Sequence, residues 1–271
     1  MSFDRGPALL FCPADRPDRY ATALQRADAV ILDLEDAVAP SRRAAARGAL
    51  IDAELDPARV IVRVNPVGTP DFEADLATLS QTDLRLVMVA KAESPKRIAR
   101  IDPRFSVIAL CETARGVVAC EKIAALDNVT ALMWGADDLV ASLGGTASRR
   151  PGAGAGYRDV ARYARARVLL AAGARRIAAI DAVHLDIADE RGLRAEAEDA
   201  AASGFAASAC IHPRQVETIR AAYRPDDETV RWARGVLAAA ESEGGVFAFE
   251  GRMIDEPLLR QARTALARAA R

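Results

Sequence analysis

Eight short apolar runs constrain the fold of this chain more than any other feature of its sequence. They occupy residues 8–11, 29–32, 60–62, 86–89, 107–110, 131–134, 177–180 and 207–211. A charged or polar residue follows each run closely, and helical stretches separate the runs. Strands that are buried on both faces have continuous apolar sequences rather than alternating ones. Eight such strands alternating with helices predict an α/β protein, a closed (β/α)8 TIM barrel, whose catalytic groups lie where the strands end.

The length of the chain fits one barrel and an extension. A TIM barrel takes about 250 residues, and this chain has 271. We expect the barrel core to cover residues 1–215 and a C-terminal helical extension to cover residues 216–271. The extension carries Phe247, Phe249 and Met253 between two predicted helices. Because exposing these side chains to water is unfavourable, we expect them to pack, either on their own barrel or on a neighbouring subunit.

Composition and charge narrow the classes of partner. The 37 basic and 38 acidic residues leave a formal net charge of −1. A surface that binds nucleic acid or membrane needs a basic excess, so we expect neither partner. No apolar run reaches the roughly 18 residues of a membrane span, and the N-terminus lacks a signal pattern, which predicts a cytoplasmic protein. The four cysteines include no CxxC pair and are expected to be buried thiols.

Local signals predict where several helices begin. Ser41 and Ser94 each precede a helical stretch and are expected to cap it, and Asp15 is a possible cap for the first helix. A further helix is expected over residues 189–203. Residues 144–156 are too rich in glycine for regular structure. Such a loop at the strand-end face of a barrel is either a mobile lid or a linker, and the sequence does not choose between them.

Two carboxylates follow neighbouring predicted strands. Glu112 comes after the fifth strand and Asp138 after the sixth. Adjacent parallel strands lie about 4.8 Å apart, so the two side chains can share one ion. Oxygen ligation by few protein groups suits Mg²⁺, which keeps several waters. The alternative is that either carboxylate caps the next helix or pairs with Arg115.

Other charged residues are expected on the same rim. Arg63 ends the third strand and could grip a carboxylate or stabilise an enolate, while Lys91 is a second cation. Both could equally form ion pairs with the acidic residues after the second strand, which are Asp33, Glu35 and Asp36. The two histidines have structural interpretations: His184 as a packed or solvent-facing residue, and His212 as a hydrogen-bonding residue that fixes the end of the eighth strand.

Seven ordered motifs carry a resemblance to a known family. They are FCPADRPDR (11–19), LDLEDAV (32–38), VRVN (62–65), ETARG (112–116), WGADDL (134–139), IHP (211–213) and GRMID (251–255). In this order they closely resemble the citrate lyase β-subunit-like (CitE-like) branch of the HpcH/HpaI aldolase superfamily, in its short stand-alone form. The resemblance spans nearly the whole chain. The glycine-rich loop matches none of its motifs.

The resemblance implies a role for particular residues. Glu112 and Asp138 match the Mg²⁺ ligands of the family, and Arg63 matches the catalytic arginine beside the metal. Further residues match groups that bind the substrate: Glu35, Asp36, Lys91, and the backbone of Gly135 and Ala136. Asp255 matches a catalytic acid that enters from a neighbouring subunit in oligomeric relatives. The CoA phosphates have weaker candidates in Arg16, Arg19 and Arg47.

The resemblance also implies an activity. It indicates a Mg²⁺-dependent β-hydroxyacyl-CoA lyase that forms acetyl-CoA and a 2-oxo acid such as pyruvate or oxaloacetate. Citramalyl-CoA, malyl-CoA and hydroxymethylglutaryl-CoA are the candidate substrates. Three alternatives stay open: condensation followed by thioester hydrolysis, as in malate synthase; a citrate lyase subunit that needs an acyl-carrier protein; and a non-catalytic barrel that binds acyl-CoA. Composite active sites are expected in a homo-oligomer, most simply a homotrimer.

Overall fold

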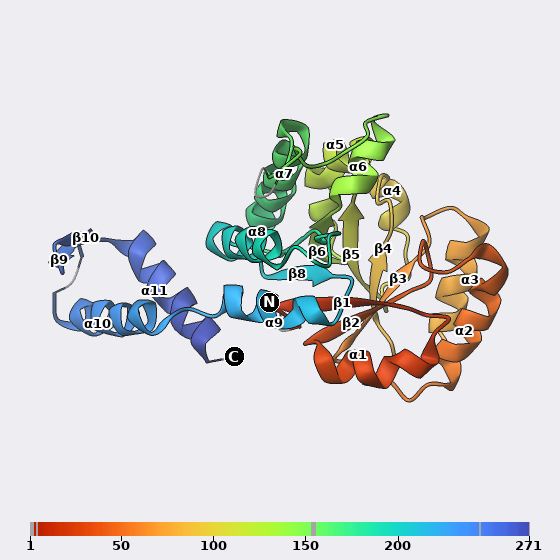
Figure 1. Ribbon diagram of the computed structural model, residues 1–271, viewed down its shortest axis with the longest axis horizontal. Helices are drawn as coiled ribbons and strands as arrows, with labels where there is room; N and C mark the ends of the chain where they lie inside the picture. The colour runs from red at the N-terminus through yellow and green to blue at the C-terminus, as the bar shows by residue number, and fades with distance from the viewer. Residues whose placement is uncertain (1–2, 4, 153–155, 244, 271) are drawn as a thin grey trace. The chain divides into compact units, whose positions relative to one another are not determined.

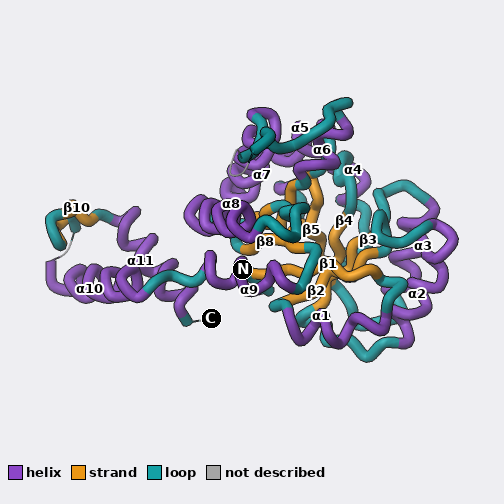
Figure 2. Tube along the Cα trace, viewed as in Figure 1, coloured by secondary structure: helices purple, strands orange, loops and turns teal. Residues whose placement is uncertain are grey.

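Eight parallel strands close into a barrel in the N-terminal part of the chain (Figures 1 and 2). The computed structural model describes residues 3, 5–152, 156–243 and 245–270. The strands are β1 (Ala8–Pro13), β2 (Ala29–Asp33), β3 (Val60–Val64), β4 (Leu86–Val89), β5 (Ser106–Cys111), β6 (Val129–Trp134), β7 (Ala178–Asp181) and β8 (Ala207–Cys210). Pairing of Ala8 with Ser208 and of Leu10 with Cys210 joins β1 to β8 and closes the barrel. The predicted (β/α)8 fold is confirmed.

Apolar side chains fill the inside of the barrel. Leu9, Ile31, Ile61, Met88 and Ile108 belong to one buried cluster to which most of the strands contribute. Surrounding helices cover the outer face of the strands (Figure 1). Both faces are therefore removed from water, which explains why the strands have continuous apolar sequences.

The helices of the barrel follow the strands in the expected alternation. They are α1 (Tyr20–Arg26), α2 (Arg43–Asp52), α3 (Pro70–Leu79), α4 (Pro95–Ile98), α5 (Ala114–Ala124), α6 (Ala136–Ser142), α7 (Asp159–Arg175) and α8 (Glu190–Ser203). The predicted cap is right at Ser94, whose Oγ accepts from the Arg97 amide at 3.4 Å. In the structure Asp189 caps α8, because its carboxylate accepts from the Gly192 amide. Gly204 ends α8 with a φ of +107°, a backbone conformation that favours glycine.

Two predicted caps are wrong. A short 3₁₀ turn over Pro40–Arg42 includes Ser41, so α2 begins after it, with Arg42 at the cap position and no side-chain cap. Pro40 begins this turn because its fixed φ suits a first helical position. Asp15 does not cap the first helix, because Arg16 precedes the 3₁₀ turn and Arg19 precedes α1, and neither end has a side-chain cap. The Asp15 carboxylate instead lies 2.7 Å from Nε of Arg42.

The chain divides into two compact units, residues 1–219 and 220–271. The boundary predicted after residue 215 falls inside α9 (Arg214–Tyr223). The second unit contains α10 (Asp227–Glu243), a hairpin of β9 (Phe247–Phe249) and β10 (Arg252–Ile254), and α11 (Glu256–Ala269). Phe247 is buried in the core of this unit and Phe249 packs against it, whereas Met253 is 66% exposed. Among the described residues, no helix combines the length and the apolar character that crossing a membrane requires.

Candidate active site

Glu112 and Asp138 come from neighbouring strands, as expected. Cys111 at the end of β5 pairs with Trp134 at the end of β6, so Glu112 lies beside Gly135. A Cβ atom at Gly135 would lie 2.7 Å from the Glu112 Cβ, so only glycine permits this close approach. Asp138 follows in the first turn of α6. Thr113, not Glu112, caps α5 by accepting from the Gly116 amide at 3.0 Å, so the Glu112 carboxylate is not used as a cap.

The charge balance at Glu112 favours a divalent cation. Its side chain is buried, and burial together with the nearby negative charge of Asp138 raises the pKa of Glu112 to about 8, although Arg63 opposes the shift. A divalent ion held between the two carboxylates would remove their repulsion. Two carboxylates with open positions for water or substrate oxygens are the donor set that Mg²⁺ uses in proteins. Within the described part of the chain, no group of three or more His, Cys, Asp and Glu side chains is arranged to hold a metal.

Arg63 is fixed by a carboxylate on the neighbouring strand. Its Nε and Nη2 donate to the two oxygens of Asp33 at 2.7 and 2.6 Å. Asp33 is buried and also accepts from the amides of Glu35 and Ala37, so it holds both the guanidinium and the turn after β2. The third nitrogen, Nη1, lies 3.3 Å from Glu35. Burial opposes the charged form of Arg63, but the hydrogen bonds and charge of Asp33 raise its pKa above the usual range.

Lys91 links the acidic turn after β2 to Glu112. Its φ of +47° is unusual for a residue with a side chain and occurs two residues after the end of β4. In this conformation its amide donates to Oε1 of Glu112 at 3.0 Å, while its Nζ contacts Glu35 and lies 3.2 Å from Asp36. The Nζ is also 4.0 Å from Asp138. Lys91 thus contacts both predicted metal ligands.

The ion pairs left open by the sequence are therefore present, and they gather Arg63, Lys91, Glu35 and Asp36 around Glu112 and Asp138.

The other predicted site residues lie at the starts of two helices. Gly135 is the cap residue of α6 and has no side chain that could cap it, and Ala136 is the first residue of this helix. Asp255 caps α11 in the second unit, where its carboxylate accepts from the Leu258 amide at 3.4 Å.

The three arginines suggested for CoA have different surroundings. Arg16 is 41% exposed and pairs with Asp18, and Arg19 lies in the exposed 3₁₀ turn after β1. Arg47, on α2, instead donates to two carboxylates of α3, those of Asp75 at 2.8 Å and Asp71 at 2.7 Å. Its guanidinium is already paired with two carboxylates. A role of these arginines in binding phosphate stays a prediction.

The histidines and cysteines have the structural roles expected of them. His184 is buried, with Nδ1 3.0 Å from Glu196. Nδ1 of His212 accepts from the Arg214 amide where β8 leads into α9. All four cysteines are free and buried. The sequence reasoning missed the polar groups behind β6 and β7, among them Arg149 with Glu196 and Arg165 with Asp181, because nothing in their spacing pairs them.

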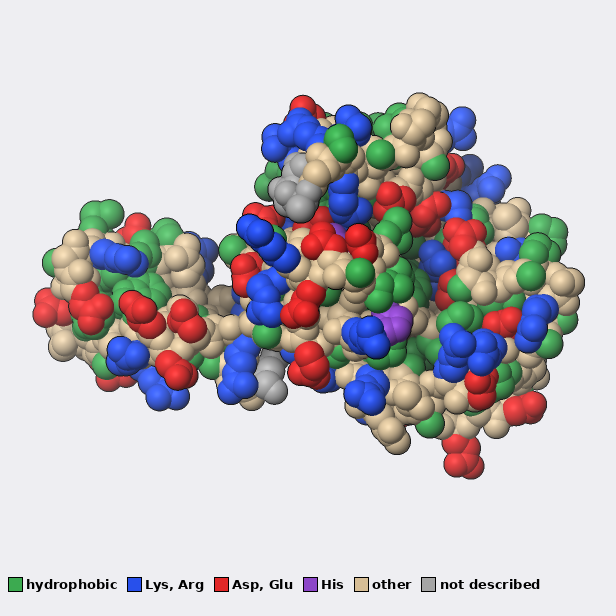
Figure 3. Space-filling view, in the orientation of Figure 1, with side chains coloured by type: hydrophobic (Ala, Val, Ile, Leu, Met, Phe, Trp, Pro, Cys, Tyr) green, Lys and Arg blue, Asp and Glu red, His purple; other side chains and the backbone are tan. Residues whose placement is uncertain are grey.

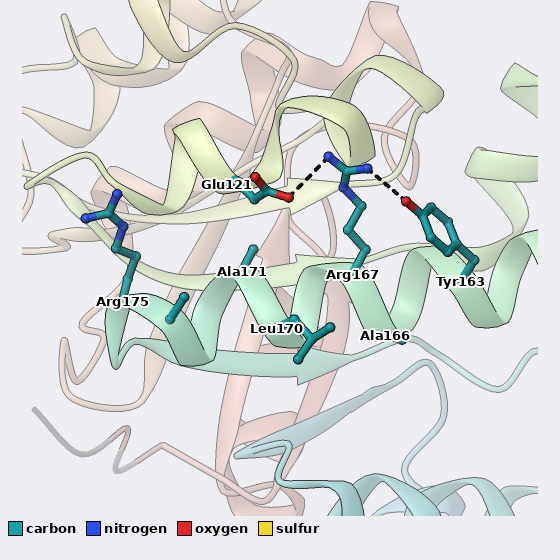
Figure 4. A pocket seen from close by; sticks show the side chains of 8 residues that line it. Glu121, Tyr163, Ala166, Arg167, Leu170, Ala171 and Arg175 are labelled. Atoms are coloured by element: carbon teal, nitrogen blue, oxygen red, sulfur yellow. Dashed lines mark hydrogen bonds and ion pairs between the residues drawn. The ribbon is translucent and has the colours of Figure 1, made fainter.

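Two hollows on the outside of the barrel are separate from the strand-end cluster. One, of about 550 Å³, lies along α7 beside α5, where Arg167 contacts Glu121 and Tyr163 and Leu170 is exposed (Figure 4). The other, of about 530 Å³, is lined by α7, α8 and the glycine-rich loop. Neither includes Glu112 or Asp138. Basic and acidic side chains are mixed over the face drawn in Figure 3.

Comparisons with known proteins show the family to which the chain is similar. The model of the HpcH/HpaI aldolase/citrate lyase family matches residues 8–213. A citrate lyase subunit beta-like protein of Mycobacterium tuberculosis is 55% identical over 264 residues, 97% of this chain and 96% of that protein. Human mitochondrial citramalyl-CoA lyase is 32% identical over 87% of this chain and 76% of its own length. A (3S)-malyl-CoA thioesterase of Cereibacter sphaeroides is 33% identical over 90% of this chain and 87% of its own.

A solved structure matches nearly the whole chain. The crystal structure of the M. tuberculosis protein CitE in complex with magnesium, acetoacetate and coenzyme A superposes with a TM-score of 0.93 at 54% identity. The match covers 98% of this chain and 99% of that one. The similarity therefore includes both compact units.

Proposed function

The chain belongs to the HpcH/HpaI aldolase/citrate lyase family, as the seven motifs indicate, and we propose that it is a Mg²⁺-dependent lyase acting on β-hydroxyacyl-CoA thioesters. The products would be acetyl-CoA and a 2-oxo acid, with citramalyl-CoA as the preferred candidate substrate. The 32% identity to human citramalyl-CoA lyase and the magnesium and coenzyme A in the structure of the M. tuberculosis relative support this proposal.

One observation carries the proposal: Glu112 directly follows β5, Asp138 lies in the first turn of α6 after the adjacent strand β6, and Arg63 and Lys91 lie beside them. Bound by these two carboxylates, Mg²⁺ would supply positive charge next to the oxygens of a 2-oxo acid. The amides of Gly135 and Ala136, at the uncapped start of α6, would donate to the carboxylate of that acid. Lys91, Glu35 and Asp36 would line the same site.

The reaction breaks the bond between the hydroxyl-bearing carbon and the carbon next to the thioester. The hydroxyl group gives up its proton to solvent, its oxygen becomes the carbonyl oxygen of the 2-oxo acid, and the electrons of the broken bond pass to the carbon beside the thioester. Arg63, fixed by Asp33, would stabilise negative charge on the oxygen as the bond breaks. Asp255 would give a proton to the carbon beside the thioester, which then becomes the methyl group of acetyl-CoA.

The CoA part of the substrate requires cationic groups for its phosphates. Arg19 is exposed and follows β1 at the strand-end rim, so it suits this role, whereas the half-exposed Arg16 would have to exchange its pairing with Asp18 for a phosphate. Arg47 is the weakest candidate, since a phosphate would have to compete with Asp71 and Asp75.

Asp255 would act in a neighbouring subunit of a homotrimer. Phe247 and Ile254 anchor the hairpin in its own unit, whereas the exposed Met253 leaves the other side of the hairpin available to a second copy. A second copy that packed on this side of the hairpin would remove Met253 from water close to Asp255.

A product analysis tests the function. The protein would be incubated with citramalyl-CoA, malyl-CoA or hydroxymethylglutaryl-CoA in the presence of MgCl₂, and acetyl-CoA, free CoA and the organic acid would be separated by chromatography. We expect acetyl-CoA and an equimolar oxo acid from at least one thioester. Free CoA with an intact hydroxy acid would instead indicate a thioesterase, the activity named for the C. sphaeroides relative. If no thioester were turned over, the lyase proposal would fail, and a non-catalytic barrel that binds acyl-CoA would be favoured.

A further inference from the structure

The glycine-rich loop after α6 is closed at its base. The Arg158 amide donates to the Ser148 carbonyl at 2.8 Å, and the Arg150 amide donates to the Gly156 carbonyl at 3.0 Å. Arg149 and Tyr157 pair between these bonds as an antiparallel bridge. Residues 153–155 lie outside the described residues. The base of the loop is thus held by backbone hydrogen bonds.

Arg149 holds this base against the barrel. Its Nε and Nη2 donate to the two oxygens of Glu196 on α8 at 2.8 and 2.9 Å. Nη2 also donates to the Val183 carbonyl beyond β7, and the guanidinium lies 4.3 Å from the centre of the Tyr157 ring. A bidentate carboxylate pair and a stacked ring use the planar shape of a guanidinium, which lysine lacks. The contacts therefore favour arginine specifically.

Two routes lead from Arg149 to the turn that carries Asp138. In the first, Nη1 donates to the Ser148 hydroxyl at 3.3 Å, and this hydroxyl donates to the Asp137 carboxylate at 2.8 Å. Nη1 is itself 3.7 Å from Asp137. Ser148 is buried, so water competes little for these bonds. Asp137 and Asp138 share the first turn of α6, so fixing one restrains the other.

The second route runs through two aromatic rings. Tyr157, held by Arg149, packs edge-on against Trp134 with the ring centres 5.1 Å apart. Trp134 is fully buried at the end of β6, directly before Gly135. The chain between Trp134 and Asp138 is therefore held from both ends by groups that Arg149 contacts or orders.

We propose that Arg149 is a positioning residue of the metal site: it fixes the start of α6, and with it the Asp138 carboxylate, from outside the barrel. This inference rests on the proposed function, in which Asp138 binds Mg²⁺. Groups that orient a metal ligand typically change metal affinity by 10- to 100-fold when they are removed. Arg149 reaches Asp138 through the backbone of α6, so we place its effect at the lower end.

The test measures Mg²⁺ binding rather than activity alone. MgCl₂ would be titrated calorimetrically, with pyruvate present, into the wild-type protein, Arg149→Lys and Arg150→Lys. We expect Arg149→Lys to raise the dissociation constant of Mg²⁺ about 10-fold. Arg150→Lys is the matched control, because Arg150 is the next residue, is about half exposed and pairs with Asp159 away from α6. Its dissociation constant should stay within about two-fold of the wild type.

A double variant separates positioning from general stability. Arg149→Met leaves the partly buried Glu196 without its main partner and should lower the melting temperature. Arg149→Met with Glu196→Gln removes both charges and should recover much of the lost melting temperature. We expect the Mg²⁺ dissociation constant of the double variant to stay raised. If the double variant regained both its melting temperature and the wild-type Mg²⁺ affinity, the inference would be overturned. Wild-type Mg²⁺ binding in Arg149→Lys would also overturn it. A wild-type protein that binds no Mg²⁺ would overturn the proposed function with it.

Discussion

At the scale of single residues, two arginine–carboxylate pairs fix the positions of charged side chains in this barrel. Arg63 donates from Nε and Nη2 to the two oxygens of Asp33. Arg149 donates in the same way to the two oxygens of Glu196. In each pair a planar guanidinium meets a carboxylate in two parallel hydrogen bonds, the geometry that a lysine cannot reproduce. Conservative substitutions in these pairs should therefore have large effects.

Replacing Arg63 by lysine should lower kcat by about 10²-fold or more, by analogy with the loss of one donor to a developing oxyanion. The lysine keeps the charge but cannot span both oxygens of Asp33, so its charge will not lie where the arginine places it. Steady-state kinetics with the accepted thioester measure the effect. Arg104→Lys, an exposed arginine that pairs with Asp102, is the control. An unchanged kcat in Arg63→Lys would reduce Arg63 to a structural ion pair.

Glu196 should make stability depend on acid pH. Burial favours its neutral form, but hydrogen bonds from Arg149 and His184 lower the pKa of Glu196 from 4.5 to about 2. A carboxyl whose pKa is lowered by folding stabilises the protein above its unfolded pKa and loses this contribution as the pH falls through the folded value. The stabilisation is therefore fully present above about pH 4.5 and disappears toward pH 2, and it amounts to about 3 kcal/mol at most.

Denaturant unfolding of Glu196→Gln at several pH values checks this expectation. The variant should be less stable than the wild type at neutral pH, and the difference should shrink between pH 4.5 and the lowest pH at which both proteins fold. Glu198→Gln changes an exposed residue of the same helix and should show no such trend. A difference in stability that is constant with pH would show that the Glu196 charge has no special role.

The turn from β6 into α6 is the element on which the site depends most. It carries Gly135, Ala136 and Asp138, and its glycine lets Glu112 approach from β5. Gly135→Ala would place a Cβ atom 2.7 Å from the Cβ of Glu112, so one of the two strand ends must shift.

We expect Gly135→Ala to raise the Mg²⁺ dissociation constant about 10-fold or more, as a change beside a metal ligand does. Calorimetric titration measures it. The control is Gly48→Ala in α2, where no atom lies within 4 Å of the added Cβ. That change should leave Mg²⁺ binding unaltered and should stabilise the helix by about 0.5–1 kcal/mol. Normal Mg²⁺ affinity in Gly135→Ala would mean that the turn tolerates a side chain, contrary to this description.

The sequence predicts elements better than their connections. The eight strands are visible because burial on both faces demands continuous apolar residues, and the strand-end positions of Glu112 and Asp138 follow from the fold. Ser41 was predicted wrongly because a 3₁₀ turn precedes α2, and a cap signal does not distinguish the two helix types. The contacts of Arg149 with Glu196 join residues 47 positions apart, and no local rule pairs them. Long-range polar contacts of this kind depend on side-chain geometry that the chain acquires only when folded.

At the scale of the whole molecule, the second unit, residues 220–271, is additional to the (β/α)8 barrel. It has its own apolar core, which includes Ala233, Val236, Phe247 and Ile254, and its hairpin leads directly to Asp255. If Asp255 acts in a neighbouring subunit, two different inactive variants should complement each other. Asp255→Ala and Glu112→Ala subunits, mixed after dissociation and reassembly, should regain part of the wild-type activity, because some mixed sites contain both groups.

Native mass spectrometry would show that hybrids form and would count the subunits, which we expect to be three. The reassembled wild type and each reassembled single variant are the controls for recovery of the fold. Hybrids that form but stay inactive would place Asp255 in its own barrel or outside the reaction, and would contradict the composite site.

The central claim is that Glu112 and Asp138 make this barrel a Mg²⁺-dependent carbon–carbon lyase. The most direct test is the rate of acetyl-CoA release from citramalyl-CoA as a function of Mg²⁺ concentration, after removal of metal with EDTA, for the wild type, Glu112→Gln and Asp138→Asn. We expect EDTA to abolish the wild-type rate and Mg²⁺ to restore it. At a Mg²⁺ concentration that saturates the wild type, the rates of both variants should stay at least about 10²-fold lower. Acetyl-CoA release that survives EDTA, or that both variants retain, would contradict it.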